Sequence, residues 1–274
     1  MESPEFLPDM NESITTAIDK GTPDVSIVVP VYNEGQVIEE VLRTILGVDF
    51  GEYKREIVVI DDGSNDETRE VLKRFHNTQG LKIVYRQDNG GKGAATRDGI
   101  STTTGKVIII QDADLEYEPS QIPMLAKPIL EGKAKVVYGS RFRGVIRNMS
   151  LIRRLANRFL TCYINLLFSS NISDACTCYK TFDGDLIRGF ALKSDGFEIC
   201  HEITANALRR GYEIKELPIA YCARCADEGV KSSWKDLIKQ LGYVLIFRFG
   251  RQSGSEGSKP LSGGYKATGG SSTN

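Results

Sequence analysis

Short apolar runs alternate along the chain with stretches in which apolar residues recur at helical spacing. The runs are rich in Val and Ile, which is typical of strands buried on both faces of a sheet. Four of them are Val25–Val31, Glu56–Ile60, Val107–Ile110 and Lys135–Tyr138. Helical spacing occurs between them, as at Val37–Ile45 and Thr68–Phe75. Strands that alternate with helices predict an α/β fold with a mostly parallel sheet flanked by helices.

Acidic residues follow these predicted strands. Asp61 and Asp62 come directly after the second run, and Asp112 and Asp114 follow the third. In an open parallel sheet, ligands bind beyond the carboxyl ends of the strands, so we expect these side chains to lie in a cleft. Carboxylates one residue apart at a strand end suit a hard divalent cation that carries a phosphate in its shell. An acidic turn without function would show the same Asp-x-Asp pattern.

Five short motifs occur in a fixed order along the chain. They are Pro30–Glu34 (PVYNE), Asp61–Asp66 (DDGSND), Asn89–Gly93 (NGGKG), Asp112–Asp114 (DAD) and Gly139–Phe142 (GSRF). In this order they resemble the family 2 glycosyltransferases. The later segments Asp174–Lys180, Gly196–Glu198 and Glu202–Thr204 are most similar to the polyprenyl-phosphate (dolichyl-phosphate) hexose synthases. The resemblance covers residues 24–230 and implies a GT-A (nucleotide-diphospho-sugar transferase) fold with a Rossmann-like, mostly parallel sheet.

The resemblance implies a metal site on the Asp-x-Asp motif. Asp114 and the residue two positions further on, Glu116, are the implied ligands of Mg²⁺ or Mn²⁺, and Asp112 is directed toward the metal, a metal-bound water or the ribose. Many relatives carry Gln where this chain has Glu116, a change that keeps an oxygen donor and adds charge. Negative charge grows on the leaving diphosphate, so the cation would supply Lewis acidity and Asp114 would be catalytic.

The resemblance also implies a pocket for the nucleotide of a GDP- or UDP-hexose. Asp61 and Asp62 would accept hydrogen bonds from the base and the ribose, because carboxylates are acceptors only. Pro30, Tyr32 and Glu34 would line the same pocket, with Glu34 toward the ribose. For Pro30 and Tyr32 the alternative is a rigid strand exit with an ordinary packed ring.

Three basic residues are implied phosphate contacts. Lys92 lies in a glycine-rich turn before a predicted helix at Ala94–Ile100, where the backbone can approach a diphosphate closely. Arg141 follows the predicted strand Lys135–Tyr138 and would hold the acceptor phosphate as a catalytic residue. Arg224 would face a phosphate as well. A guanidinium forks onto phosphate oxygens in a way that an ammonium does not. A solvated turn lysine and surface ion pairs are the alternatives.

The acceptor decides whether the enzyme needs a general base. A hydroxyl must lose its proton as it attacks, whereas the oxygen of a phosphate monoester is already anionic. Glu198 and Glu202 are the candidate bases, four residues apart on one face of a predicted helix. Glu202 is included among the catalytic candidates, and its alternative role is to orient a loop. The two histidines, His76 and His201, lie on no motif that faces the cleft, and this shortage of bases favours a phosphate acceptor.

Composition fits one enzyme domain without a nucleic-acid partner. The 274 residues include 35 Lys and Arg against 36 Asp and Glu, a net charge of −1 that gives no general attraction to a polyanion. The sequence shows no signal-peptide pattern and no apolar run of about 18 residues. Six Cys without a secretory signal suit a reducing compartment, and Cys176, Cys178, Cys222 and Cys225 lack typical zinc spacing. We expect a cytoplasmic protein.

Two amphipathic stretches favour contact with a membrane. Leu151–Phe168 and Trp234–Leu245 combine basic and aromatic residues in a way that suits a lipid headgroup interface, although both could instead cover the core. A peripheral position on the cytoplasmic face of a membrane, or a membrane protein partner, would bring the enzyme to a lipid acceptor. The expected organisation is a polar extension (1–23), a catalytic domain (24–230), an amphipathic helix (231–251) and a disordered tail (252–274).

These observations predict an inverting, metal-dependent glycosyltransferase that moves a hexose from GDP-mannose or UDP-glucose to a polyprenyl or dolichyl phosphate. Inversion is expected because the resembled family acts by one displacement and no enzyme nucleophile is evident. The first alternative is transfer to the hydroxyl of a sugar, a protein or a modified base, which would need Glu198 or Glu202. The second is an inactive subunit that binds a nucleotide sugar.

Overall fold

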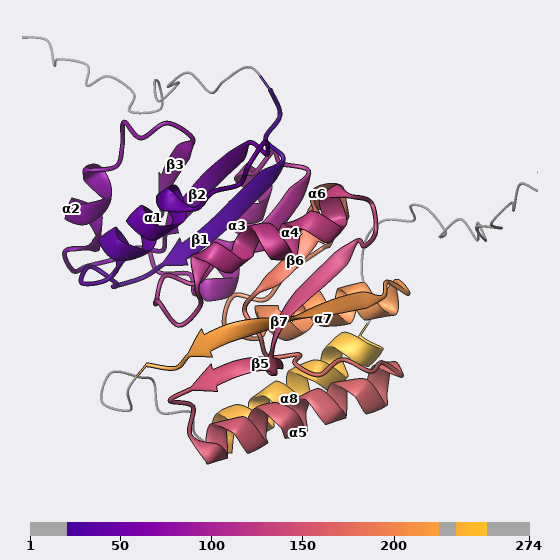
Figure 1. The fold of residues 1–274 in the computed structure, drawn as a ribbon. Coiled ribbons are helices and arrows are strands. Elements are labelled where there is room, and N and C mark those ends of the chain that lie inside the picture. The colour runs from indigo at the N-terminus through magenta and orange to yellow at the C-terminus, as the bar shows by residue number, and fades with distance from the viewer. Residues whose placement is uncertain (1–20, 225–233, 251–274) are drawn as a thin grey trace, which may run out of the picture.

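The computed structural model describes residues 21–224 and 234–250 of the chain (Figure 1). The polar extension predicted for residues 1–23 lies almost wholly outside the described residues, and so does the tail predicted for residues 252–274. The boundary predicted at residue 230 falls in the undescribed stretch 225–233.

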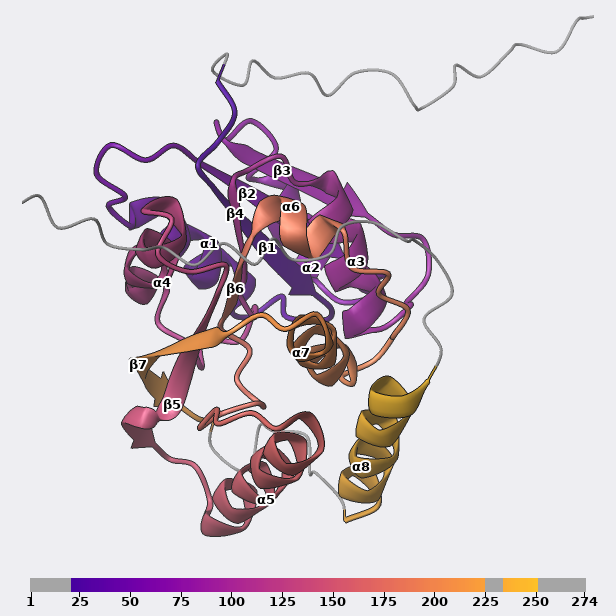
Figure 2. The same ribbon diagram turned by 90° about the vertical axis from the view of Figure 1, so that its right-hand side faces the viewer.

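A seven-stranded sheet forms the centre of the molecule (Figures 1 and 2). Its strands are β1 (Val25–Val31), β2 (Arg55–Asp61), β3 (Leu81–Tyr85), β4 (Val107–Ile110), β5 (Val136–Arg147), β6 (Lys180–Asp183) and β7 (Ile214–Cys222). Their order across the sheet is β3-β2-β1-β4-β6-β5-β7. Strand β6 is antiparallel to β4 and to β5, and the other neighbours are parallel. The predicted α/β fold with a mostly parallel sheet is confirmed.

Helices cover both faces of the sheet (Figure 2). They are α1 (Ile38–Gly47), α2 (Thr68–Lys73), α3 (Lys92–Thr102), the 3₁₀ helix η1 (Pro119–Gln121), α4 (Ile122–Leu130), α5 (Leu151–Phe168), α6 (Gly184–Arg188), α7 (Ile199–Arg209) and α8 (Trp234–Phe249). Successive side chains of a strand point to opposite faces. Ile27 and Val29 therefore pack with α1 and α4, whereas Val28 packs with Ile100 of α3. Burial on both sides explains why the strands are continuously apolar.

Strand β5 is longer than its sequence pattern predicts. The apolar run ends at Tyr138, but the strand continues to Arg147 because its second half pairs with β7, after an irregularity between Ser140 and Val145. The prediction that Arg141 follows the strand is therefore wrong, and Arg141 lies within it. Pairing with a partner about 75 residues away leaves no local signal.

The two predicted amphipathic stretches are helices, α5 and α8, and they lie side by side (Figure 1). The Nε atom of Arg248 in α8 donates to the carbonyl of Leu167 in α5 at 2.8 Å, and Val244 of α8 is buried. Helix α8 also packs against α7. Among the described helices, none has both the length and the apolar character needed to cross a bilayer.

Candidate active site

The predicted site residues gather where β1, β2 and β4 end. These strands are parallel neighbours, so their carboxyl ends lie at one edge of the sheet. The residues that directly follow β2 and β4 are joined to β1 by backbone hydrogen bonds: Asp62 donates to the carbonyl of Val31, and Gln111 donates to that of Val28. The structure thus brings together loops that are far apart in the sequence, as the pattern of strands and acidic turns predicts.

The carboxylates of the Asp-x-Asp motif point in different directions. Oδ1 of Asp112 lies 2.6 Å from Nζ of Lys92. Oδ1 of Asp114 accepts a hydrogen bond from the backbone N–H of Glu116, which the left-handed conformation of Leu115 turns back toward it. The carboxylate of Glu116 accepts from the hydroxyl of Tyr221 at 2.6 Å and from the backbone N–H of Arg224 at 3.0 Å.

The charge balance around Asp114 fits a divalent cation. Burial, together with the neighbouring carboxylates of Asp112 and Glu116, raises the pKa of Asp114 to about 7. A cation bound by Asp114 would relieve both effects, and oxygen donors are those that Mg²⁺ and Mn²⁺ prefer. Among the described residues no three His, Cys, Asp or Glu side chains already form a metal cage. Asp112 and Glu116 would have to exchange their present partners to join Asp114.

Lys92 is the first residue of α3, two positions earlier than the helix predicted from the sequence. The preceding Gly91 has a φ of 93°, a conformation that favours glycine. The Lys92 side chain is largely buried, and although burial opposes its charge, Asp112 holds the pKa of Lys92 well above its usual value. A fixed ammonium at a helix N-terminus is suited to an anion such as a diphosphate.

Asp61 and Asp62 are buried and hold the architecture around the site. Asp61 accepts from Nε of Arg69 at 2.6 Å. Asp62 accepts from the backbone N–H groups of Gly90 and Gly91, at 3.0 and 2.7 Å, and so shapes the glycine-rich turn. Contact of these carboxylates with a base or a ribose, as the resemblance implies, remains a prediction.

Glu34 and Arg224 form an ion pair that joins the loop after β1 to the segment after β7. Nη2 of Arg224 lies 2.8 Å from both carboxylate oxygens of Glu34, and its Nε donates to the carbonyl of Asp114. Burial raises the pKa of Glu34 in spite of this pairing. Pro30 is buried within β1, whereas Tyr32 is exposed, so the packed-ring alternative fails for Tyr32.

Arg141 faces a carboxylate of the protein. Its Nε and Nη2 atoms donate to Asp174 at 2.7 and 2.8 Å, in a bidentate pair that is almost completely buried. Its guanidinium also lies 5.1 Å from the centre of the Tyr221 ring, and Tyr221 in turn binds Glu116. The predicted phosphate role of Arg141 would thus require an acceptor that competes with Asp174.

Arg153 is a basic residue of the site that the sequence predicts only as part of the amphipathic stretch Leu151–Phe168. It lies in the first turn of α5, and its Nη1 atom is 3.8 Å from Oε1 of Glu116. Its side chain is 40% exposed, so it is far more accessible than Arg141. The sequence places a pair of arginines in the first turn of this helix. Only the fold brings Arg153 beside the acidic motif.

Glu202 is buried in the first turn of α7 and faces backbone N–H groups. Its carboxylate accepts from Lys193 N–H and from Ser194 N–H, with distances of 2.8–3.1 Å. Glu198 directly precedes the helix and accepts from the N–H of Gly196. His201 is buried too, with its Nε2 atom 3.4 Å from Oε1 of Gln240. Within residues 21–224 and 234–250, the hydrogen bonds of these three side chains go to partners outside the Asp-x-Asp motif.

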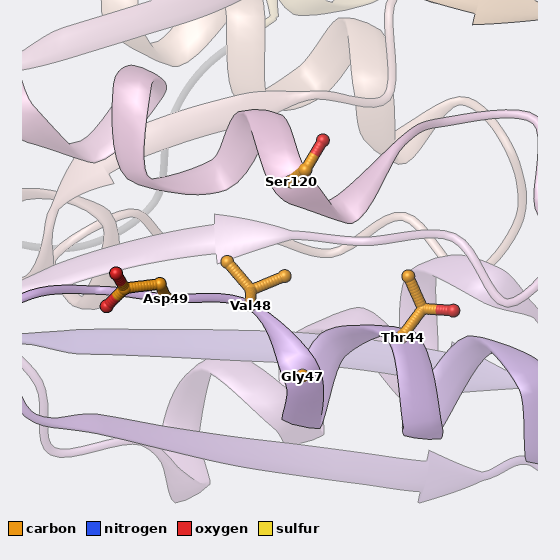
Figure 3. Close-up of a pocket in the computed structure, with 5 residues that line it drawn as sticks. All are labelled: Thr44, Gly47, Val48, Asp49 and Ser120. Carbon is orange, nitrogen blue, oxygen red and sulfur yellow. The ribbon is translucent and has the colours of Figure 1, made fainter.

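A hollow of about 420 Å³ lies away from this cluster, at the end of α1 (Figure 3). It is lined by Thr44, Gly47, Val48, Asp49 and Ser120. None of the residues predicted for the donor or the metal lines it. Cys176 and Cys178 are free thiols, and the described residues contain no cluster that would hold zinc.

Comparison with known proteins identifies the family. Residues 26–189 match the profile of Glycosyl transferase family 2, so the chain belongs to this family of glycosyltransferases. It is 30% identical over 203 residues to an uncharacterised protein of Methanocaldococcus jannaschii, with 72% of this chain and 80% of that protein covered.

Two relatives carry names that describe an activity. A dolichol-phosphate mannosyltransferase of Pyrococcus furiosus is 28% identical, with 80% of this chain and 62% of that protein covered. A low-salt glycan biosynthesis hexosyltransferase of Haloferax volcanii is 29% identical, with 86% and 56% covered. The chain therefore spans less than two thirds of the length of either protein.

Solved structures confirm the fold. Glucosyl-3-phosphoglycerate synthase of Mycobacterium tuberculosis is similar with a TM-score of 0.63 at 22% identity, over 85% of this chain and 83% of that one. The same enzyme has been solved with Mn²⁺, uridine diphosphate and phosphoglyceric acid, and with Mg²⁺ and uridine diphosphate. The GT-A fold expected from the motifs is the fold observed.

Proposed function

We propose that this chain transfers a hexose from a nucleoside-diphosphate sugar, GDP-mannose or UDP-glucose, to the phosphate of a polyprenyl or dolichyl phosphate, with inversion and with Mg²⁺ or Mn²⁺. The observation that carries the proposal is the cluster of Asp112, Asp114 and Glu116 next to Lys92 and Arg224. The names of the Pyrococcus and Haloferax relatives support the hexose and, in one case, the lipid phosphate.

The chain's own residues have separate tasks on the donor. Asp114, with Asp112 and Glu116, would hold the divalent cation, which supplies Lewis acidity toward the diphosphate when bound. Lys92 would meet the diphosphate oxygens from the start of α3 and balance the charge that grows on them as the sugar leaves. Asp62 would keep the glycine-rich turn in place through Gly90 and Gly91.

A phosphate acceptor agrees with the acid–base inventory of the site. The phosphate oxygen attacks without losing a proton, so no general base is required. The carboxylate of Glu202, the main candidate base, already accepts hydrogen bonds from two backbone N–H groups. Arg153 and Arg224 both lie beside Glu116 and would offer guanidinium groups to an incoming phosphate.

The face formed by α5 and α8 supports a lipid-bound acceptor. Ile152, Leu155 and Leu166 of α5 are between 67% and 81% exposed, and Ile246 and Phe249 of α8 are exposed as well. Helix α5 contains three arginines and no acidic residue. Exposed apolar side chains with basic neighbours suit the headgroup region of a membrane with anionic lipids. Because Arg153 lies in the first turn of α5, the N-terminal end of this helix adjoins the site.

Transfer of radiolabelled sugar tests the proposal. UDP- and GDP-hexoses would be incubated with Mn²⁺ or Mg²⁺ and a short-chain polyprenyl phosphate, and the lipid would be extracted. We expect label in the organic phase that disappears with chelator. Donor hydrolysis without labelled lipid would overturn the phosphate acceptor and favour a hydroxyl acceptor. Absence of both hydrolysis and transfer would favour the inactive subunit.

A further inference from the structure

The loop Lys193–Glu198 lies directly against the start of α3. The carbonyl of Asp195 accepts hydrogen bonds from the backbone N–H groups of Gly93, at 2.6 Å, and Ala94, at 3.2 Å. These N–H groups belong to the first turn of the helix, where no intrahelical partner exists for them. The loop therefore acts as the cap of α3, the helix that begins with Lys92.

The contact leaves no room for side chains on the glycine-rich turn. A Cβ atom on Gly91 would lie 2.4 Å from the carbonyl oxygen of Asp195, and one on Gly93 would lie 2.3 Å from that of Ser194. Both obstacles are backbone atoms, which cannot swing aside as a side chain would. The position of the loop and the position of the glycine-rich turn are thus mechanically coupled.

Two side chains hold the loop in this position. Glu202 binds the N–H groups of Lys193 and Ser194 from the α7 side. Arg97, on α3, donates to the carbonyl of Ser194 and, at 2.7 Å, to the carboxylate of Asp195. A continuous series of contacts therefore leads from Glu202 through the loop to Gly93, the neighbour of Lys92, whose Nζ lies 2.6 Å from Asp112.

We propose that Glu202 is a positioning residue for donor binding: it holds the loop Lys193–Glu198 against α3 and thereby fixes Lys92 where the diphosphate of the donor binds. It does not act as a general base. This inference rests on the proposed function for the identity of the ligand, and it concerns the half of the site that binds the nucleotide rather than the acceptor.

Binding of nucleotides to the full chain separates the two roles of Glu202. The variants are Glu202→Gln and Arg97→Ala, and the control is Glu213→Gln, an exposed carboxylate just beyond α7. Titration calorimetry with Mn²⁺ would compare GDP and UDP with GMP and UMP. Both variants should weaken diphosphate binding about tenfold and leave monophosphate binding unchanged, because Lys92 would meet the second phosphate. The control should match the wild type.

Kinetics provide the second readout. In both variants the KM for the donor should rise about tenfold, while kcat stays within about threefold and its pH profile keeps its shape. If Glu202→Gln fails to fold, Arg97→Ala still tests the inference, because Arg97 is partly exposed and binds the same loop through Asp195.

Three outcomes would overturn the inference. A large loss of kcat at unchanged donor affinity in Glu202→Gln would make Glu202 a catalytic base. Nucleotide binding unchanged in both variants would show that the loop does not govern Lys92. If the wild-type protein binds neither GDP nor UDP, the proposed function itself fails, and this inference fails with it.

Discussion

At the scale of single residues, the charges of the site are already paired within the protein. Lys92 faces Asp112, and Arg224 faces Glu34. A diphosphate that binds here has to compete with carboxylates for the same cations. If Asp112 joined Asp114 in holding a divalent cation, Lys92 would lose its present partner and would be available to the diphosphate. Bound metal should therefore raise the affinity for the donor, and bound donor should raise the affinity for the metal.

The first prediction concerns Asp114. Asp114→Asn should lower turnover by at least roughly a hundredfold and weaken Mn²⁺ binding, because an amide replaces the carboxylate that we propose holds the cation. Transfer assays and calorimetric titration with Mn²⁺ would measure the two effects. Glu118→Gln, an exposed neighbour in the same loop, is the matched control and should keep full activity. Normal Mn²⁺ affinity in Asp114→Asn would remove Asp114 from the metal site.

The second prediction concerns the buried His201. Burial and the nearby Lys180 lower its pKa from 6.5 to about 4. The unfolded chain therefore takes up this proton first as the pH falls, so stability is lost between about pH 6.5 and pH 4. At about pH 5 the loss from this group is about 2 kcal/mol in the free energy of unfolding.

Urea unfolding of the wild type and of His201→Gln checks this expectation. Between about pH 7.5 and pH 5 the wild type should lose about 2 kcal/mol more than the variant does. Other acid-sensitive groups are common to both proteins and cancel in the comparison. Equal losses would mean that His201 takes up its proton as readily in the folded state as in the unfolded chain.

The sequence identifies most of the residues at this scale but not their partners. The Asp-x-Asp motif and Lys92 are brought together as predicted. The partner of Arg141, Asp174, lies 33 residues away, and Glu202 faces backbone atoms, which no residue type reveals. Arg153 acquires its place only through the packing of α5. A side chain's chemistry is local, whereas its partner depends on the tertiary fold.

At the scale of elements, the start of α3 is the most constrained part of the site. Gly93→Ala would bring a Cβ into the backbone of Ser194 and should destabilise the protein by about 1–3 kcal/mol, with weaker binding of GDP or UDP. Gly47→Ala, at the end of α1, meets no atom within 4 Å and should be neutral or slightly stabilising. Thermal unfolding of both variants would measure these changes in stability. A Gly93→Ala variant as stable as the Gly47→Ala variant would contradict the tight contact between Gly93 and Ser194.

The elements themselves follow closely from periodicity. The continuous apolar runs are strands β1, β2 and β4, because both faces of the sheet are covered, and the helical spacings give α1, α2, α5 and α8. The extension of β5 and the antiparallel β6 were not predictable in the same way. Lys180–Asp183 has no apolar run, and its strand exists because β4 and β5 lie on either side of it.

At the scale of the whole molecule, the face of α5 and α8 predicts affinity for lipid. Leu155→Asp with Phe159→Asp should reduce binding to vesicles with anionic lipid at least tenfold, because two exposed apolar side chains are lost and negative charge is added. Met124→Asp, an exposed apolar residue on α4, is the control. Vesicle sedimentation measures the effect, and wild-type binding by the double variant would leave this face without a lipid role.

The pair between Arg224 and Glu34 joins residues 190 positions apart, from just beyond the last strand and just beyond the first. During synthesis on the ribosome, Glu34 is made early and Arg224 late. Strands β1, β2 and β3 are made before the chain reaches β7, and the ion pair cannot form until Arg224, which follows β7, has been made. If the proposed transfer depends on this pair, chains that end before β7 should be unable to consume a donor sugar.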